Sequence, residues 1–274
     1  MLDVQGVTKK YGKVLACDNV SFHLDPGSVT ILLGPNGAGK STIMKSIIGF
    51  LRYSGKIYVN GYENKAPEAR RILGYIPEIP SLYPNLTVSE HMEFLARAYK
   101  LKDYKGRIDS LLERFELADK KKKFGDELSK GMQQKLNICL GLLPDPKVLL
   151  LDEPMIGLDP HAIKELKKYF DETAAAGNTL LISTHIIDSV DMLWNRTLIM
   201  QNGTVKANVT RDHFDDSGKN LEELFFEVTE GLNRDDVSDG TESTDSHDTD
   251  SADSSDEMSG DTDTESIGTD LQIQ

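Results

Sequence analysis

Residues 34–41, which read Gly-Pro-Asn-Gly-Ala-Gly-Lys-Ser, constrain the fold of this 274-residue chain more than any other segment. An apolar run precedes them at residues 29–33, and residues 42–48 follow with apolar side chains at helical spacing. A phosphate-binding loop needs this order of strand, glycine-rich loop and helix. Glycines let the backbone curl until its N–H groups point at phosphate oxygens, and the helix adds its positive end. The segment therefore predicts a nucleotide-binding loop.

Two side chains at the end of this loop carry the expected chemistry. Lys40 would place a positive charge near the β- and γ-phosphates, and the Ser41 hydroxyl could ligate Mg²⁺. Hydrolysis of a nucleoside triphosphate also needs a second carboxylate near the metal and a group that orients the attacking water. Residues 148–153, Val-Leu-Leu-Leu-Asp-Glu, supply both after an apolar strand. We expect Asp152 to hold Mg²⁺, directly or through water, and Glu153 to orient or deprotonate the water; the alternative is that the two acids only cap a strand.

Hydrophobic patterning and turn signals predict an α/β chain. Expected strands cover residues 2–8, 14–24, 29–33, 55–61, 72–76, 147–151 and 179–183, with a turn at residues 9–12 and a hairpin around residues 201–203. Expected helices run from the loop to about residue 50, from Thr87, over residues 104–115, 129–143 and 160–176, from about His185, and over residues 221–230. Thr87 and Glu90 form a capping-box pattern.

The net charge of −14 is concentrated in the last part of the chain. Residues 232–274 hold one Arg, 14 Asp and Glu, 14 Ser and Thr and no aromatic residue. Such a segment cannot bury enough apolar surface to offset its ordering entropy, so we expect a disordered acidic tail. It is either a solvating appendage or a segment for phosphorylation or partner binding, as at residues 253–257. The rest of the chain has no basic excess, which argues against nucleic acid as a partner, and the lysine run at residues 120–123 is typical of a solvated surface.

Cysteine usage and hydropathy indicate the compartment. Cys17 and Cys139 lie in apolar surroundings without metal-like spacing, so we expect buried, reduced thiols. No signal-peptide pattern opens the sequence and no apolar run approaches about 18 residues. We therefore expect a cytoplasmic protein that does not cross a membrane by itself.

Five short motifs occur in the order of a known family. After residues 34–41 come residues 128–133 (Leu-Ser-Lys-Gly-Met-Gln), 149–153, 157–160 (Gly-Leu-Asp-Pro) and 183–185 (Ser-Thr-His). Over about residues 2–230 this order resembles the ATP-binding cassette of ABC transporters. The resemblance implies a P-loop NTPase fold of the ABC ATPase type. It would have a RecA-like core sheet, an antiparallel β subdomain and a helical subdomain at about residues 79–143, in a domain that covers residues 1–231.

The resemblance also implies a site shared by two cassettes that face each other, because ATP in this family lies between one phosphate loop and the partner's signature helix. The implied ATP contacts within one chain are Tyr11, which would stack on adenine, and Gly34, Pro35, Asn36, Gly37, Ala38, Gly39, Lys40, Ser41 and Thr42. The implied contacts from the partner are Ser129, Gly131 and Gln133. Asp159 would signal across the dimer, and His185 would contact the γ-phosphate beside Glu153. By itself His185 is more typical of a core or helix-start histidine, and Ser129 of a helix N-cap.

Two positions depart from the family pattern. Glu78 stands where the family usually has Gln, and residues 128–132 read Leu-Ser-Lys-Gly-Met instead of Leu-Ser-Gly-Gly-Gln. A Glu78 oxygen can still reach Mg²⁺ or a water, and Ser129 and Gly131 are retained, so we expect an active ATPase. Both variants, with residues 83–91, resemble the exporter-associated bacterial subgroup. Within that subgroup, residues 70–230 as a whole resemble the ATP-binding subunit of the Ecs-type transporter.

The resemblance implies the ATP-hydrolysing subunit of an exporter. It would work as a homodimer or heterodimer of cassettes beneath a separate membrane-spanning permease, on the inner face of the membrane, with contacts around residues 76–100. One alternative is a soluble cassette that acts on ribosomes or DNA. Such proteins usually carry two cassettes or a long coiled coil, which the roughly 87 residues between Ser41 and Leu128 cannot hold. The other alternative, a regulator that binds ATP without turnover, is disfavoured by Glu153 and His185.

Overall fold

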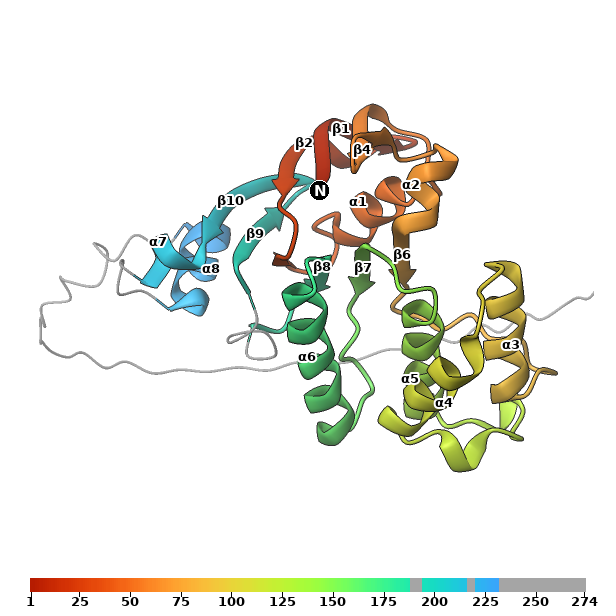
Figure 1. Cartoon of the computed structure of the whole chain (residues 1–274). Coiled ribbons are helices and arrows are strands. Elements are labelled where there is room, and N and C mark those ends of the chain that lie inside the picture. Colours follow the sequence, from red (N-terminus) through yellow and green to blue (C-terminus); the bar gives the residue numbers. More distant parts are fainter. Residues whose placement is uncertain (188–193, 216–219, 232–274) are drawn as a thin grey trace, which may run out of the picture. The chain divides into compact units, whose positions relative to one another are not determined.

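The computed structural model describes residues 1–187, 194–215 and 220–231. The predicted acidic tail at residues 232–274 and most of the helix predicted from about His185 lie outside the described residues. Within residues 1–231 the described elements form two β-sheets and a set of helices (Figure 1).

The larger sheet has six strands and is almost entirely parallel. Its order is β10 (Thr204–Thr210), β9 (Arg196–Gln201), β3 (Val29–Leu33), β8 (Thr179–Thr184), β7 (Val148–Asp152) and β6 (Leu73–Ile76). Only the pair β9–β10 is antiparallel. Every residue of β3, β7 and β8 is buried, because parallel strands are covered on both faces, and this explains the continuous apolar runs in the sequence.

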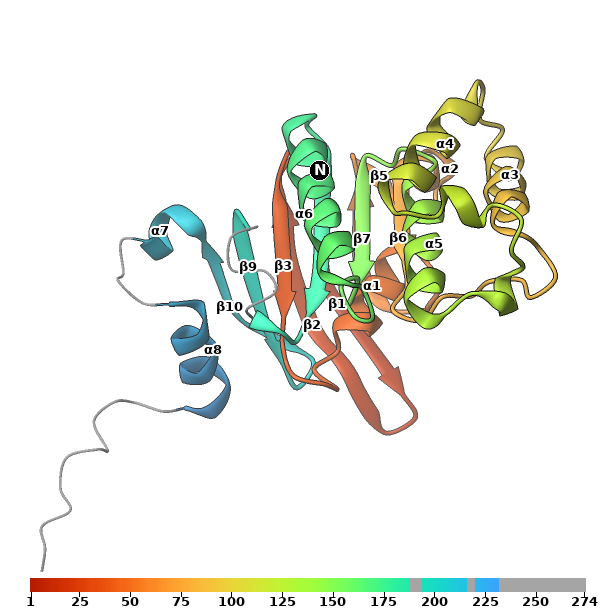
Figure 2. The same ribbon diagram turned by 90° about the horizontal axis from the view of Figure 1, so that it is seen from below.

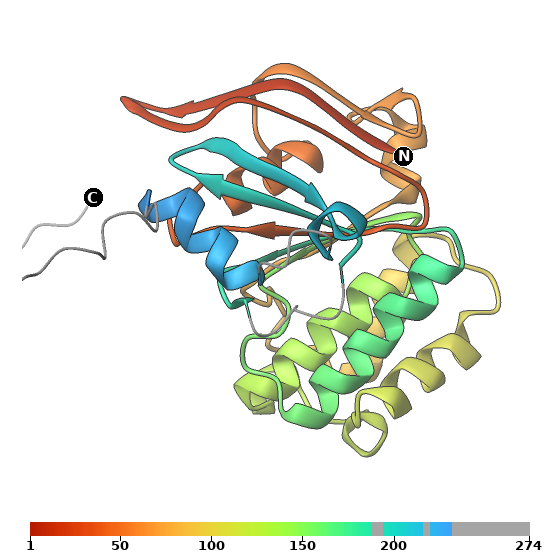
Figure 3. The ribbon, with the colours of Figure 1, turned by 90° about the vertical axis from the view of Figure 1, so that its left-hand side faces the viewer.

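The smaller sheet is antiparallel and lies across one face of the larger one. Its order is β2 (Val14–Leu24), β1 (Leu2–Tyr11), β4 (Ser54–Val59) and β5 (Tyr62–Glu63). Helix α1 (Lys40–Ile47) lies between the two sheets (Figure 3). Its buried Ile43, Met44 and Ile47 pack in one hydrophobic cluster with residues of both sheets. The strand β3 and helix α1 are thereby fixed on either side of residues 34–39.

Helices cover the opposite face of the six-stranded sheet. They are α3 (Val88–Ala98), α4 (Tyr104–Arg114), α5 (Lys130–Leu142), α6 (Pro160–Ala175) and α8 (Leu221–Glu230). A second hydrophobic cluster joins them to the sheet, with Phe115 and Phe170 among its largest fully buried side chains. Helices α3, α4 and α5 gather beside β6, and α6 lies closer to β7 and β8 (Figures 1 and 2).

Several local predictions are confirmed. Strands β2 and β3 and helix α8 have the predicted bounds, and the hairpin lies at Asn202 and Gly203. Thr87 caps α3 in a reciprocal pair with Glu90. Both cysteines are buried and unpaired, and burial raises the pKa of the Cys17 thiol to about 11. Among the described helices, none is both long and apolar enough to span a bilayer.

Other local predictions are wrong. The first strand continues to Tyr11, because Lys9–Tyr11 stay paired with β2, so the turn lies after Tyr11 rather than at residues 9–12. Helices α2 (Pro67–Ile72) and α7 (Arg211–Asp215) and strand β5 were not predicted. Each is too short to give a clear hydrophobic period. Two 3₁₀ turns, η1 (Ala118–Lys120) and η2 (Gly125–Glu127), lead into α5.

The packing of α5 against β6 gives a first test. A Cβ added at Gly141 of α5 would lie 2.2 Å from Cγ1 of the fully buried Ile76, whereas one added at Gly106 of α4 would meet no atom within 4 Å. We expect Gly141→Ala to lower the free energy of unfolding by about 1–3 kcal/mol through overpacking. Gly106→Ala should raise it by up to about 1 kcal/mol, because alanine is the better helix former. Chemical denaturation measures both; equal effects of the two variants would contradict the packing.

Candidate functional site

A pocket of about 560 Å³ lies over residues 36–42, at the end of the larger sheet where β3, β7 and β8 finish. The loop and the start of α1 form its floor. Glu78, Glu153 and His185 line it from the side of the helices, and residues 14–16 of β2 with Asn202 and Gly203 line it from the other. The pocket thus gathers segments that are far apart in the sequence.

Gly34 and Gly39 of the loop are required by its close approach to neighbouring backbone. Gly39 has φ of 105°, and a Cβ there would lie 2.4 Å from the carbonyl oxygen of Ala16. A Cβ at Gly34 would lie 2.3 Å from the carbonyl oxygen of Met200. Because both obstacles are backbone atoms, no other residue fits at either position without displacing a strand.

Lys40 is almost fully buried beneath the loop. Its ammonium donates to the carbonyl oxygens of Gly34 and Pro35, at 2.7 and 3.2 Å, and lies 3.5 Å from a Glu153 carboxylate oxygen. These contacts compensate the desolvation of the charge and hold it inside the curl of the loop. A phosphate bound by the loop would therefore meet a positive charge that is already in place.

Asp152 is the best-satisfied carboxylate of the site, and it is 1% exposed. Its Oδ1 accepts hydrogen bonds from Ser41 Oγ at 3.1 Å and Ser183 Oγ at 2.6 Å. Its Oδ2 accepts one from Tyr75 Oη at 3.2 Å. Burial, together with the neighbouring Asp152 charge, raises the pKa of Tyr75 well above its usual value, so the phenol stays a donor. Three hydroxyls from β6, α1 and β8 thus fix this carboxylate.

The oxygen-rich donor set fits Mg²⁺, which prefers hard oxygen ligands. Ser41 and Glu78 line the pocket, whereas Asp152 lies behind Ser41 and reaches the pocket through that hydroxyl. Ser41 is therefore the residue that would hold the ion directly, and Asp152 would act through Ser41 or a water. When bound, the ion would neutralise charge on the phosphates.

Glu153 joins the loop to the segment after β8. It has a left-handed backbone, with φ of 47°, and is 6% exposed. Its backbone N–H donates to Ser183 Oγ at 3.1 Å, and its Oε1 lies 2.9 Å from His185 Nδ1. The carboxylate is therefore held in the pocket wall by a histidine on one side and by Lys40 on the other. A strained backbone with a fixed carboxylate suits a residue that positions a water.

Other predicted site residues do not line this pocket. Tyr11 is 46% exposed at the end of β1, with the Lys9 ammonium 4.8 Å from its ring centre. Its strand neighbours Val14 and Leu15 line the pocket instead and offer apolar surface to a base.

The predicted signature residues surround the start of α5, away from the phosphate loop. Ser129 is exposed and caps α5 by accepting from the Met132 N–H. Gln133 donates to the carbonyl oxygens of Gly125 and Leu128, each at 3.2 Å, so its amide is used within the chain. A Cβ at Gly131 would lie 3.0 Å from the carbonyl oxygen of Gly157, which brings this helix start against the segment that contains Asp159.

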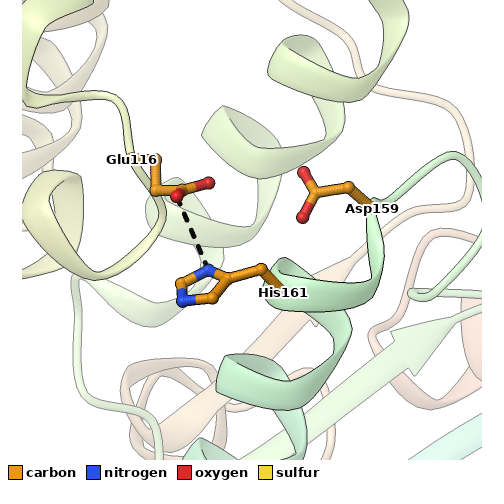
Figure 4. A group of neighbouring side chains, drawn as sticks. All are labelled: Glu116, Asp159 and His161. Carbon is orange, nitrogen blue, oxygen red and sulfur yellow. Dashed lines mark ion pairs between the residues drawn. The ribbon is translucent and has the colours of Figure 1, made fainter.

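Asp159 belongs to an ionic cluster rather than to the pocket. It caps α6 by accepting from the Ala162 N–H at 2.9 Å, and Lys135 of α5 bridges it and Glu116, at 2.7 and 2.8 Å. Glu116, Asp159 and His161 point toward one another (Figure 4). The ammonium of Lys135 already serves as the cation for both carboxylates, so the group is an ion-pair network.

The ion pairs change the pKa values of this cluster. The Lys135 ammonium and the Ala162 N–H lower the pKa of Asp159. Burial lowers the pKa of Lys135, but hydrogen bonds to Asp159 and Glu116 outweigh it, so the net pKa is raised. Both groups are therefore charged at neutral pH, and α5 is tied to the start of α6.

Sequence reasoning assigned no role to Tyr75, Ser183 or Lys135. Ser183 belongs to residues 183–185, and its place two residues before His185 was a usable signal. Tyr75 lies three residues before Glu78 in a strand, and nothing in the sequence shows that its hydroxyl reaches Asp152.

Comparison with known proteins identifies the family. The family model described as ABC transporter matches residues 17–156. The chain belongs to the ABC transporter ATP-binding family. It is 37% identical over 238 residues to the ABC-type transporter ATP-binding protein EcsA of Bacillus subtilis, covering 84% of this chain and 96% of that protein. It is also 37% identical over 226 residues to the lantibiotic transport ATP-binding protein SrtF of Streptococcus pyogenes, covering 82% and 96%.

Solved structures of ABC cassettes share the fold. One ATP-binding subunit of an ABC transporter is 39% identical, with a TM-score of 0.78 over 83% of this chain and 99% of that one. Another is a dimeric cassette in a post-hydrolysis state with bound ADP and phosphate. It is 26% identical, with a TM-score of 0.68 over 77% and 98%. The predicted P-loop fold of the ABC ATPase type is confirmed, and the chain is an ATP-binding ATPase of this family.

The contacts of Glu153 generate a test of hydrolysis. Replacing its carboxylate in Glu153→Gln should lower kcat for ATP hydrolysis by about 10²–10⁴-fold, because the amide cannot accept a proton from water. ATP binding should remain within a few-fold, since Lys40 and the loop are retained. Phosphate release and nucleotide titration measure the two quantities.

The matched control is Glu172→Gln, which changes a carboxylate that pairs with Arg114 outside the pocket. It should leave kcat unchanged. A Glu153→Gln protein that hydrolyses ATP as fast as the original would remove Glu153 from this role.

Proposed function

We propose that this chain is the ATP-hydrolysing subunit of an exporter, and that it works as a dimer of cassettes docked on a separate membrane-spanning subunit. The proposal rests on one observation: the predicted ATP contacts of one chain lie in two separate places. Ser129 and Gly131 lie outside the pocket that contains Lys40 and Glu153. A second cassette, facing the first, would bring its signature helix to that pocket and complete it.

Each site residue would then have a separate role in binding or hydrolysis. The loop amides and Lys40 bind the phosphates, Ser41 with Asp152 holds Mg²⁺, and Glu153 orients the attacking water. His185, held against Glu153, contacts the γ-phosphate. When two cassettes close over ATP, its hydrolysis removes the contact that favours the closed state, and the dimer reopens.

Ion pairs suggest how the partner's nucleotide is sensed. Asp159 follows the loop after Glu153 and is fixed by Lys135 to the helix that begins at Ser129. A shift of the signature helix would therefore move Asp159 as well. This supports the proposal that Asp159 carries a signal across the dimer.

Export is supported by the relatives. SrtF is named as a lantibiotic transport protein, and other relatives at 36% identity are named as Nod factor export proteins. We propose the same direction for this chain, at the inner face of a cell membrane. We also propose that residues 1–231 form the cassette, with a helical subdomain at about 79–143, and that residues 232–274 are a separate acidic tail.

An exposed apolar surface within residues 76–100 suits the membrane subunit. Ile79, Tyr83 and Phe94 are 77%, 56% and 54% exposed. The rings of Tyr83 and Phe94 meet edge to face, with centroids 5.8 Å apart. The Tyr83 backbone N–H donates to the buried His91, which fixes the loop onto α3. Solvent-exposed aromatic residues on a fixed loop are a common feature of protein interfaces.

The transport role can be tested by affinity purification. Tagged Glu153→Gln protein, with ATP present, should retain its membrane subunit from detergent extracts, because the closed dimer persists. The same protein with Tyr83→Asp and Phe94→Asp should lose that subunit yet still bind ATP. Glu113→Lys, an exposed residue of α4 outside residues 76–100, serves as the surface control and should keep the membrane subunit. Recovery of ribosomes or DNA-bound proteins in place of a polytopic membrane protein would contradict the transport role.

A further inference from the structure

Strand β9 ends between the phosphate loop on one face of the sheet and helix α8 on the other. Met200 and Gln201 are its last two residues. Because successive side chains of a strand point to opposite faces, these two residues have different neighbours. Met200 lies in the hydrophobic cluster that contains α1, whereas Ile199, on the same face as Gln201, lies in the cluster that contains α8.

The end of β9 supports the phosphate loop. A Cβ at Gly34 would lie 2.3 Å from the carbonyl oxygen of Met200, and one at Gly39 would lie 2.8 Å from the Met200 Cε. In the turn after β9, the Gly203 N–H donates to the carbonyl oxygen of Ala38 at 3.0 Å, and Gly203 also lines the pocket. A displacement of this strand end would therefore displace the loop.

The opposite face of the strand end is tied to the last turn of α8. The Gln201 side-chain amide donates to the backbone carbonyl oxygen of Thr229 at 2.7 Å. The last four carbonyls of a helix have no partner within it, and that of Thr229 is one of them. Gln201 thus caps α8 from a strand, while Leu224, Phe225 and Val228 pack the helix against the apolar cluster beneath it (Figure 2).

We propose that Gln201 is a positioning residue for nucleotide binding, which couples the docking of α8 to the shape of the phosphate loop. With α8 docked, the amide fixes the end of β9, and Met200 with the following turn supports the loop. When the last turn of α8 leaves the sheet, the strand end loses this contact and the loop binds phosphates less tightly. The coupling acts within one chain, so it needs neither a second cassette nor a membrane subunit.

The variant Gln201→Met tests the coupling, because methionine keeps the length of the side chain and removes the donor. The measurement is the affinity of the full chain for ADP by titration calorimetry, since ADP offers phosphates to the loop without being hydrolysed. We expect the affinity to fall about two- to tenfold, the range of one hydrogen bond between neutral groups. An unchanged affinity would overturn the proposal. Failure of the proposed dimer or transport role would not alter this result, because only one chain is involved.

Linkage gives a second test, which includes the unchanged protein. If docked α8 tightens ADP binding, bound ADP must stabilise the docked helix by the same factor. Amide hydrogen exchange at residues 227–231 should therefore slow when ADP is added, and Gln201→Met should lose this slowing. If Gln201 only stabilised the helix, the variant would speed exchange equally with and without ADP and would leave the ADP affinity unchanged. That result, or exchange in the unchanged protein that does not respond to ADP, would overturn the coupling.

Asn208→Ala is the matched control. Asn208 accepts a hydrogen bond from Arg196 Nη1 at 2.8 Å, across the same pair of strands. Its neighbours Ala207 and Val209 pack toward the helices, so Asn208 points to the face opposite α8. The variant weakens the β9–β10 pair without touching α8, and it should keep both the ADP affinity and the slowing of exchange. Equal losses in Asn208→Ala and Gln201→Met would assign the effect to the strand pair and overturn the role of Gln201.

Discussion

The rest of the site depends on one buried carboxylate and the hydroxyls around it. An ionised carboxylate that is 1% exposed would cost several kcal/mol of desolvation if it had no partners. This desolvation cost is offset by hydrogen bonds to Asp152 from Ser41, Ser183 and Tyr75, which come from three separate elements. The carboxylate can therefore be buried and charged only when α1, β8 and β6 are all in register with β7. The contacts that keep this carboxylate buried therefore also set the geometry of the phosphate site.

The same register sets the position of Glu153, the proposed catalytic carboxylate. Asp152 pairs with Ser183 across the parallel strands β7 and β8, so the next residue of each strand end emerges at one edge of the sheet. Glu153 and His185 meet there, over Lys40. The second group of predicted ATP contacts, at the start of α5, is joined by Lys135 to Asp159 and not to this edge. On the proposed function, a single chain would carry two half-sites, joined through the segment between Glu153 and Asp159.

The sequence could predict the features that are formed by residues close together in the chain. Three such features lie where they were expected. They are the loop at residues 34–41, the apolar strand before Asp152 and the helix cap at Ser129. Contacts between distant elements could not be predicted, since Tyr75 and Asp152 are 77 residues apart and no local pattern links them. The end of β1 was misplaced because Lys9, Lys10 and Tyr11 resemble a turn, yet pairing with β2 holds them extended. The functional roles of the predicted site residues remain predictions from the family, for Tyr11, Glu78 and Gln133 as for Ser129, Gly131, Asp159 and His185.

We propose that two chains complete each ATP site, and the molar mass of the protein in solution tests this proposal. Light scattering on the Glu153→Gln protein should show a change from one chain to two when ATP and Mg²⁺ are added. Adding Ser129→Arg to that protein should leave ATP bound to a single chain, because the arginine blocks the contact at the start of α5. An ATP-bound Glu153→Gln protein that stays a single chain, or a dimer that tolerates Ser129→Arg, would contradict an ATP site shared by two copies of this chain.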